Sequence, residues 1–505
     1  MKNVFFLKHF ILLVFCVLFI SACSSEPVVQ LKESTNDRMV IAIPQDFDSL
    51  DPHLSKCSVT QSILFNIFQG LVMPSQDGSM APALAENWSI SNDATSLTFY
   101  LRKDVTFHDG TEFTADDVKY TYDRLAGKIE DEASASNTLF SEVIENIEII
   151  DDYTVRININ RSDARFLSNL YWAIIPENSG NTQSSSPIGA GPYKYIEYTP
   201  GEKMILKKNE SYYEEGLPKM EEVEIKIIDD INTAIIALIN KEIQYLPVSY
   251  DIISNIPSDS FVVEYHPTNN IHFLGLNNEF EPFKDLRVRQ ALNYAINRKE
   301  IIEKLAPNSL EVNSFFSPTL NIWYEDLSEY YTQDIEKAKE LLEDAGFSDL
   351  AFTVKVPDEN PIHEQIANLI KKQYLDAGID MKIEVVDWNV WLEKVYCGRE
   401  HEATIIGLPG RLDPDFTLKQ FDSTYSRNFI NFSNEKYDQL ILKGILESDT
   451  DDRIEIYKEA QSILAEEAAS VFIMDLNSYV AIDSNLRGFV HYPLNFIDLR
   501  YFEYI

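Results

Sequence analysis

The order of apolar and polar positions after residue 37 switches repeatedly between a strand period and a helix period. Apolar residues run through 39–43 and alternate along 96–102, which predicts two strands. Further strands are expected over 223–228 and 381–386, and a hairpin over 147–159. Strands interleaved with helices in this way indicate an α/β fold with mixed sheets.

Helical spacing of apolar residues predicts the helices 58–71, 118–125, 231–240, 286–305, 335–345, 362–377, 434–446 and 451–467. Thr114 and Asp117 form a capping-box variant at the start of the second of these. Gly346 and Gly378 each follow a helix and can take the left-handed conformation that closes it. These helix-glycine-strand units indicate a separate α/β lobe, and the polar stretch 178–186 is a candidate domain crossing.

The first residues predict export. Lys2 and Lys8 precede an apolar run over 9–20 that leads into Ser21-Ala22-Cys23, the pattern of a signal peptide. The run is shorter than the roughly 20 apolar residues of a spanning helix, although an uncleaved anchor is an alternative. Either way, the body lies outside the cytoplasm.

The charge balance restricts the partners of the exported chain. The net charge is −38, and about −40 without the two signal lysines, which argues against nucleic acid and anionic lipid. Hydrophobic residues still make up 45 % of the chain and aromatics 12 %, so large cores can form. The length indicates two or three domains.

Two of the four cysteines remain in the body of the chain. Cys16 leaves with the signal, and Cys23 is the predicted lipidation site. Cys57 and Cys397 can form a disulfide in an oxidising compartment or remain as two core thiols, and the sequence leaves both possibilities open.

Motifs of enzymes are incomplete in this sequence. His363-Glu364 begins a zinc-protease pattern, but Ala367 stands where the second histidine is required. Gly189-Ala-Gly191 is followed by proline and does not form a dinucleotide loop. There is no G-x-S-x-G nucleophile motif and no phosphate loop, and the eight histidines show no metal-ligand spacing. We therefore expect no enzyme activity, no cofactor and no metal site.

Several blocks resemble the family 5 extracellular solute-binding proteins, the oligopeptide-, dipeptide- and nickel-binding group. The blocks span nearly the whole chain after Cys23: 48–53, 68–71, 82–88, 98–110, 113–118, 189–194, 209–213, 283–298 and 338–347. Ile20-Ser21-Ala22-Cys23 also resembles a bacterial lipobox, in which the cysteine is acylated. The resemblance implies a lipoprotein at the outer face of the cytoplasmic membrane or in the periplasm.

The resemblance also implies a periplasmic-binding-protein-like fold of two hinged lobes, with an extra domain on one lobe. By that analogy 1–22 is the signal peptide and 23–36 the lipidated cysteine with its tether. Domain I is discontinuous and comprises 37–72, 185–268 and 477–505. Domain II is 73–184, and domain III is 269–476.

The function that the resemblance implies is peptide capture for an ABC importer. A monomer would close on a small peptide and deliver it to a permease with ATPase subunits. The alternatives are another ligand in the same fold, namely a metal chelate, haem, an oligosaccharide or a signalling peptide, or a sensor or adhesin lipoprotein without transport.

The family's ligand-contacting segments indicate candidate site residues. The first segment corresponds to Lys56-Cys57-Ser58, where the lysine indicates an altered charge preference or is a solvated charge. Trp388 matches a tryptophan that floors a side-chain pocket, and a plain core aromatic is the alternative.

The main departure from the family lies at 406–416. Peptide-binding relatives carry an aspartate there that pairs with the ligand's α-amino group. In this chain Gly410 takes that place, beside Arg411 and ahead of Asp413-Pro414. Arg411 is suited to a ligand anion or pairs with one of the chain's acids, and Asp413 or Asp415 is a candidate substitute for the missing amine anchor.

Overall fold

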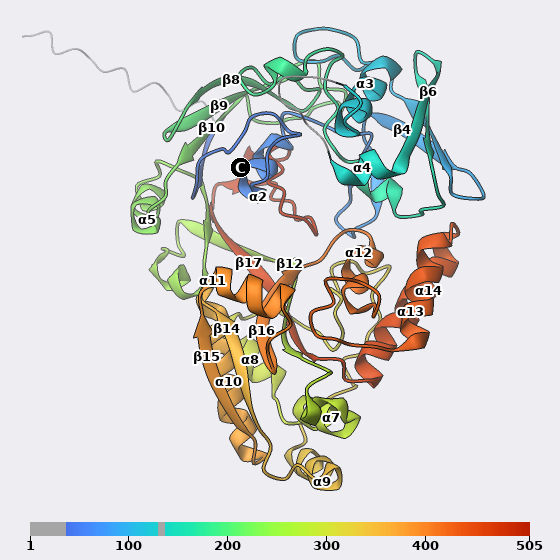
Figure 1. Cartoon of the computed structure of the whole chain (residues 1–505). Helices are drawn as coiled ribbons and strands as arrows, with labels where there is room; N and C mark the ends of the chain where they lie inside the picture. The colour runs from blue at the N-terminus through green and yellow to red at the C-terminus, as the bar shows by residue number, and fades with distance from the viewer. Residues whose placement is uncertain (1–36, 130–136) are drawn as a thin grey trace, which may run out of the picture.

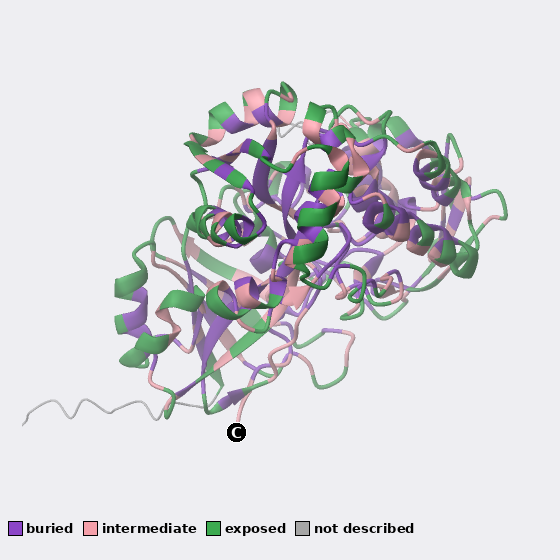
Figure 2. Ribbon diagram, turned by 90° about the horizontal axis from the view of Figure 1, so that it is seen from below, coloured by how far each residue is buried: buried purple, intermediate pink, exposed green. Residues whose placement is uncertain are grey.

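The computed structural model describes residues 37–129 and 137–505. The predicted signal peptide and Cys23 therefore lie outside the described residues. The described chain folds into two halves, one above the other in Figure 1, and two long strands, β12 and β17, run between them. Figure 2 shows buried positions on the strands and inner helix faces, with exposed positions outside.

A mixed sheet of 11 strands extends through both halves. Its path runs β15 (Asp380–Val386), β14 (Ala351–Pro357), β16 (Ala403–Pro409), β12 (Phe261–Leu276), β17 (Val471–Asp483), β11 (Tyr245–Val248), β1 (Arg38–Ile43), β10 (Glu222–Ile227), β9 (Lys203–Lys208) and β8 (Tyr193–Thr199), with β13 (Leu310–Glu311) paired to β17. Strand β1 is parallel to β10 and β11, whereas β12 is antiparallel to β16 and β17. The predicted α/β fold with mixed sheets is confirmed.

The pairing of β12 with β17 is irregular where the sheet passes between the halves. The register shifts between Pro267 and Ile271, and again between His272 and Phe273. Asn269 lies in the first irregularity, with a left-handed φ of 54°. Such bulges bend a strand and disrupt its ladder locally.

A second, antiparallel sheet lies in the upper half of Figure 1. Its order is β4 (Ala85–Ile90), β5 (Ser96–Leu101), β7 (Thr154–Ile159) and β6 (Ile144–Asp151). Helix α3 (Ala115–Leu125) packs beside it, and Thr114 and Asp117 form the predicted capping box. Three short elements complete this region: α4 (Thr138–Val143), β2 (Val72–Pro74) and β3 (Met80–Pro82).

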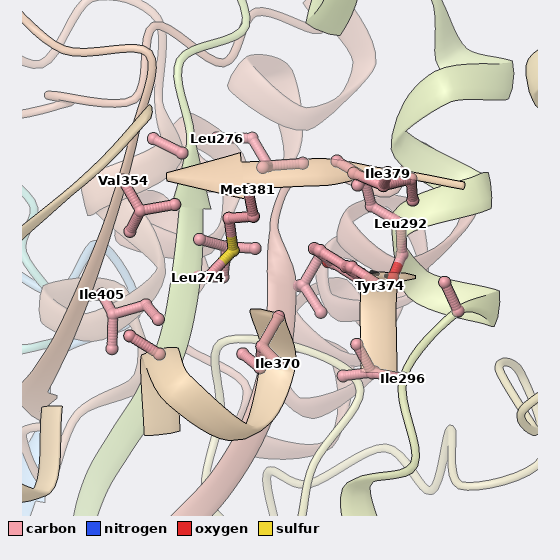
Figure 3. Close-up of a cluster of buried hydrophobic side chains, with 14 of the residues drawn as sticks. Leu274, Leu276, Leu292, Ile296, Val354, Ile370, Tyr374, Ile379, Met381 and Ile405 are labelled. Carbon is pink, nitrogen blue, oxygen red and sulfur yellow. Dashed lines mark hydrogen bonds between the residues drawn. The ribbon is translucent and has the colours of Figure 1, made fainter. Parts of the chain in front are cut away.

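The lower half is built around a continuous apolar core. Leu274 of β12, Met381 of β15 and Tyr374 of α10 (Pro361–Asp376) are fully buried in it, as Figure 3 shows. Burial of each such side chain is worth about 1.5–3 kcal/mol. Helices α7 (Leu286–Tyr294), α8 (Arg298–Leu305) and α9 (Ile335–Ala345) also contribute to this core, whereas α13 (Glu435–Leu446) and α14 (Thr450–Glu466) contribute to a second apolar cluster.

Two predicted helices differ from the observed ones. The helix expected over 58–71 ends early as α2 (Ser58–Leu64), because Asn66 turns the chain by binding the backbone of Ile497 and Leu499. The helix expected over 286–305 is broken into α7 and α8. There Asn297 accepts a hydrogen bond from the Glu300 N–H and so caps a new helix.

Candidate functional site

A cavity of about 320 Å³ lies between the two halves. Such a volume is within the usual range for small-molecule sites. Its walls come from the α2 region, from 171–173, from the loop 493–496, from the irregular middle of β12 at Thr268 and from the end of β16. The lining residues are Pro52, Ser58, Gln61, Leu64, Phe65, Phe68, Gln69, Gly70, Val72, Met73, Tyr171, Trp172, Ala173, Thr268, Pro409, Gly410, Arg411, Pro493, Leu494, Asn495 and Phe496.

Aromatic rings form much of the wall in the upper half. Phe65 stacks on Phe496 with a centroid distance of 4.4 Å and an interplanar angle of 8°. Tyr171 meets Phe496 edge-on at 6.1 Å. Rings held in this way offer a large and rigid apolar surface to a ligand.

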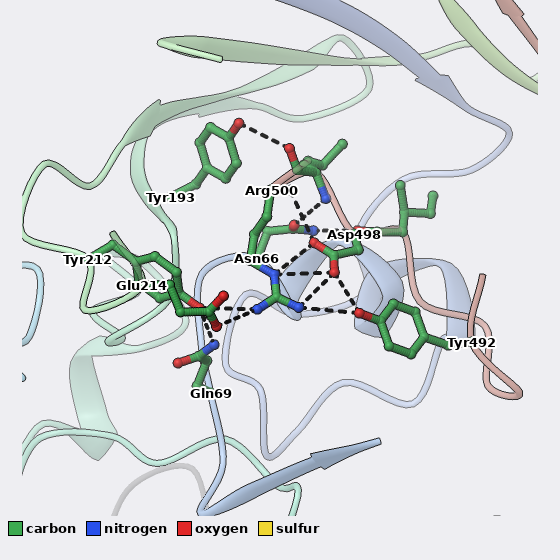
Figure 4. A network of polar contacts seen from close by, with 10 residues as sticks. Asn66, Gln69, Tyr193, Tyr212, Glu214, Tyr492, Asp498 and Arg500 are labelled. Atoms are coloured by element: carbon green, nitrogen blue, oxygen red, sulfur yellow. Dashed lines mark hydrogen bonds and ion pairs between the residues drawn. The ribbon is translucent and has the colours of Figure 1, made fainter. Parts of the chain in front are cut away.

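A buried polar network fixes the C-terminal segment next to the cavity (Figure 4). Arg500 binds Asp498 at 2.8 Å and Glu214 at 2.7 Å. Tyr492 donates to Asp498 at 2.8 Å, and Tyr212 accepts a hydrogen bond from Gln69 at 2.7 Å. The network ties the segment behind loop 493–496 to the loop between β9 and β10. It therefore holds that loop, and the ring of Phe496, in place against α2.

Gln69 joins this network to the cavity. Its side-chain nitrogen is used by Tyr212, but its Oε1 has no hydrogen-bond partner. The residue is only 6 % exposed and lines the cavity. A buried acceptor without a partner costs free energy, so a ligand N–H that reaches Gln69 would be bound favourably.

Gly410 and Arg411 form the cavity wall of the lower half. Gly410 N–H donates to the carbonyl of Asn269 at 2.6 Å, and Arg411 N–H donates to Oγ1 of Thr417 at 3.0 Å. A Cβ at position 410 would lie 2.2 Å from Oδ1 of Asn269. The position therefore requires glycine as long as Asn269 packs against it.

The predicted site residues separate into two groups. Ser58, Gly410 and Arg411 line the cavity. The side chain of Lys56 is exposed and Cys57 is partly exposed, and the N–H groups of both bind Oδ2 of Asp48, at 2.6 Å and 3.0 Å. Neither residue is among those that line the cavity.

Asp413 and Trp388 also lie away from the cavity lining. Both oxygens of Asp413 bind the guanidinium of Arg453, at 2.7 Å and 2.8 Å, and the pair is buried. Asp413 also caps α12 (Pro414–Leu418). Trp388 starts α11 (Trp388–Val390) and stacks on Trp391 at 5.2 Å. The Asp413 carboxylate is thus bound to Arg453 inside the protein.

The two cysteines are free thiols. Cys57 is partly exposed, and Cys397 is exposed. This corrects both possibilities that the sequence left open, the disulfide and the pair of core thiols. The short apolar stretches around them belong to segment ends, where the cysteine side chain remains near solvent.

The aromatic lining and Gln69 were missed as site residues. Phe65 and Gln69 follow α2, Tyr171 lies in a turn, and Phe496 lies in an irregular loop. Gln69 lies in a block that resembles the family, but no local pattern joins these segments. Only the fold brings them together.

Neither a metal-binding cluster nor a membrane-spanning helix is present in residues 37–129 and 137–505. Within these residues, no group of three or more His, Cys, Asp and Glu side chains is placed to hold a metal ion. In the same part of the chain, the helices are too short or too polar to cross a membrane.

Comparisons with known proteins agree with the fold. The sequence is 30 % identical to the dipeptide-binding protein of Pseudomonas aeruginosa, over 85 % of this chain and 87 % of that protein. It is 28 % identical to heme-binding protein A of Haemophilus influenzae, over 82 % of each. The structure of HbpA2 from Haemophilus parasuis superposes with a TM-score of 0.85 at 22 % identity, covering 93 % of this chain and 100 % of that one.

The fold is thus that of the periplasmic-binding-protein-like structures, as predicted. The model of the bacterial extracellular solute-binding proteins, family 5, matches residues 79–429, which is well over half of the chain. The chain therefore belongs to the family 5 bacterial extracellular solute-binding proteins.

Proposed function

We propose that the protein captures small peptides in the cavity between its halves and delivers them, unaltered, to an ABC permease. The observation that carries this proposal is the cavity itself, walled by both halves of a chain of this family. The Pseudomonas aeruginosa relative is named a dipeptide-binding protein, which supports a peptide as the ligand. The protein would act as a monomer, with the permease and its ATPase subunits as partners.

The proposed motion is a hinge closure of two lobes. In the proposed division, domains I (37–72, 185–268 and 477–505) and II (73–184) form one lobe, and domain III (269–476) forms the other. The border at 268/269 falls within the irregularity of β12, and the border at 476/477 lies opposite on β17. A few residues at strand irregularities can absorb the rotation of a hinge. Closure would exclude water from the cavity and strengthen its hydrogen bonds.

A peptide suits the chemistry of the cavity. Its apolar side chains would lie on Phe65, Phe496 and Tyr171, and a peptide N–H could pair with Oε1 of Gln69. Water in the remaining space can bridge to varied side chains, which permits a range of sequences.

We further propose that Cys23 carries the lipid that anchors the protein outside the cytoplasmic membrane. The sequence pattern at 20–23 supports this assignment. Metabolic labelling with a palmitate analogue should mark the protein in cells, and Cys23→Ser should abolish the label. A Cys23→Ser protein that is labelled as strongly as the wild type would contradict the anchor.

Peptide capture can be tested by titration calorimetry with the purified protein. Di- and tripeptides with apolar side chains should bind, and haem, nickel-histidine and maltotriose should serve as competing ligand classes. Ligand recovered from the complex should have an unchanged mass. Tight binding of a competing class without any peptide binding, or a chemically altered peptide, would overturn the proposed function.

A further inference from the structure

The cavity carries an unbalanced charge. Arg411 is the only Lys, Arg, Asp or Glu side chain among the described residues that line it. The chain as a whole holds 81 acidic and 43 basic residues, so a lining without any carboxylate is unusual for this protein. The cavity therefore presents one positive charge on an otherwise apolar and weakly polar wall.

Other arginines of the molecule show what Arg411 lacks. Arg453 binds Asp413 at 2.7 Å, Arg500 binds Asp498 at 2.8 Å, and Arg165 binds Asp163 at 2.6 Å. Within 37–129 and 137–505, no acid forms an ion pair with Arg411. Arg411 interacts electrostatically with Tyr171. Burial raises the pKa of the Tyr171 hydroxyl, and the positive charge of Arg411 opposes that rise.

A ligand anion is the partner that this arrangement lacks. A guanidinium can donate two parallel hydrogen bonds to a carboxylate, and charged hydrogen bonds of this kind are the strong ones. Arg411 is an exposed residue of the cavity wall, on the segment that follows β16. A carboxylate there would be fixed by Arg411 while the rest of the ligand lies against the rings of Phe65 and Phe496.

An ammonium group finds no such partner in the cavity. Moving it from water into an apolar site without a counter-ion is costly, and the guanidinium of Arg411 would repel it. Among the described lining residues, the buried side-chain acceptor without a partner is the neutral Oε1 of Gln69, which suits an amide N–H better than a cation. Asn269 fills the space next to Gly410, so no acidic side chain can enter at that position either.

We propose that the cavity selects ligands that combine an apolar body with a carboxylate and no free ammonium group, such as N-acylated dipeptides, and that Arg411 binds the carboxylate. The inference rests on the proposed capture of peptides and adds the substrate class. It makes Arg411 a specificity-determining residue.

Four derivatives of one dipeptide test this selection: Leu-Phe with its amine free or acetylated, and with its carboxylate free or amidated. Titration calorimetry should rank N-acetyl-Leu-Phe first, at least about 10-fold tighter than zwitterionic Leu-Phe. Amidation of N-acetyl-Leu-Phe should cost about 10- to 100-fold, the range for a charged hydrogen bond. In Arg411→Gln the amidated and free forms should bind within about 2-fold of each other, whereas Lys56→Gln should keep the wild-type ranking. Arg411 is exposed, and an unchanged melting temperature would show that Arg411→Gln is folded.

Two non-peptide compounds, one anionic and one cationic, test the preference for anions independently of peptide capture. If none of the four peptides binds, peptide capture fails, and 4-phenylbutyrate and 4-phenylbutylamine are then titrated into the same proteins. Binding of the butyrate alone, lost in Arg411→Gln, would support the anionic class even then. The inference is overturned if the free-amine or amidated forms bind best, if the effect of amidation persists in Arg411→Gln, or if neither non-peptide compound binds after the peptides have failed.

Discussion

Arg165 donates a hydrogen bond from Nη1 to Oδ2 of Asp415 at 2.5 Å, and so joins two segments 250 residues apart. Arg165 also binds Asp163, and its guanidinium lies over the ring of Phe416 at 5.1 Å. The N–H of Ala164 donates to the carbonyl of Ile445 at 3.1 Å on the same side. The two halves are therefore held together at a second place, apart from strands β12 and β17.

Removal of Arg165 should destabilise the protein strongly. Burial raises the pKa of Asp415, and the guanidinium of Arg165 opposes that rise. In Arg165→Ala two acids lose their counter-ion, so the free energy of unfolding should fall by about 3 kcal/mol, the loss expected for a broken buried pair. Urea denaturation followed by circular dichroism measures this change.

The matched control is Arg156→Ala in the same part of the chain. Arg156 pairs with Glu148 at 3.2 Å, and both side chains are exposed. Its loss should cost less than about 1 kcal/mol. Equal effects of the two substitutions would show that the Arg165–Asp415 contact contributes no more than a surface pair.

The ring of Phe496 should contribute to ligand affinity. Phe496 lies on Phe65 and faces the cavity, and it is only partly buried in the protein without ligand. Phe496→Ala removes apolar surface that the ligand covers, so affinity for an apolar dipeptide should fall about 10-fold. Ile196→Ala is the control, because this exposed residue of β8 does not line the cavity. Titration calorimetry on both variants would refute the assignment if their affinities were equal.

Lys56 should have little effect on binding. Its backbone N–H is held by Asp48, and its side chain is exposed outside the cavity lining. Lys56→Glu should therefore change affinity by less than about 2-fold at 0.15 M salt, which screens interactions between exposed charges. A large change in affinity would show that the Lys56 side chain contacts the ligand, which requires that the side chain move toward the cavity when the lobes close.

Local sequence patterns predicted most elements but not the cavity wall. The strands near 39–43, 96–102 and 381–386 follow from their apolar periods, and Gly346 and Gly378 both adopt the expected left-handed φ of 81°. The early end of α2 could not be predicted in this way, because it depends on Asn66 binding a segment more than 400 residues away. The cavity has the same origin, since its rings come from segments that meet only in the fold.

The candidate residues show the same limit. Arg411 and Gly410 were identified from a short motif and line the cavity, because the end of β16 faces the upper half. Asp413 belongs to the same motif, but it lies two residues after Arg411, where the chain enters α12. Its carboxylate binds Arg453 there. A motif indicates the segment, and only tertiary packing decides which of its side chains is free.

Acid should destabilise the protein through its stacked histidines. The rings of His266 and His491 are stacked with their centroids 4.3 Å apart, and the ring of Phe489 stacks on His266 at 5.5 Å. Burial lowers the pKa of His266 to about 3, with a contribution from His491, and burial lowers the pKa of His491 to about 4. In the unfolded chain these two histidines bind protons near pH 6.5. In the folded protein they bind protons only near pH 4 and pH 3. Stability is therefore full above pH 6.5 and falls as the pH drops toward 4 and 3.

The substitution His491→Phe should reduce this acid sensitivity. A phenyl ring keeps the stack with His266 but cannot be protonated. The loss of unfolding free energy between pH 7 and pH 4.5 should become smaller by about 1–2 kcal/mol. Urea titrations at the two pH values measure the difference, and an unchanged loss would exclude His491 as a source of the acid effect.

The preference for anionic ligands should be reversible at Gly410. Gly410→Asp alone places a Cβ 2.2 Å from Oδ1 of Asn269, so this variant should lose stability by about 1–3 kcal/mol, as expected for an overpacked site. Asn269 has a left-handed φ of 54°, a conformation that glycine adopts without strain, so Asn269→Gly should be tolerated and should free the required space.

The double variant Asn269→Gly/Gly410→Asp should then recover stability and place a carboxylate on the cavity wall. A free ammonium group would gain a counter-ion, so zwitterionic Leu-Phe should bind about 10-fold more tightly than to the wild type. N-acetyl-Leu-Phe should bind more weakly, because the new carboxylate repels its anion. The single variant Asn269→Gly controls for the loss of the asparagine and should keep the wild-type ranking. If the double variant is as stable as the wild type but binds the two peptides in the wild-type order of affinity, a carboxylate at position 410 does not determine the charge preference of the cavity.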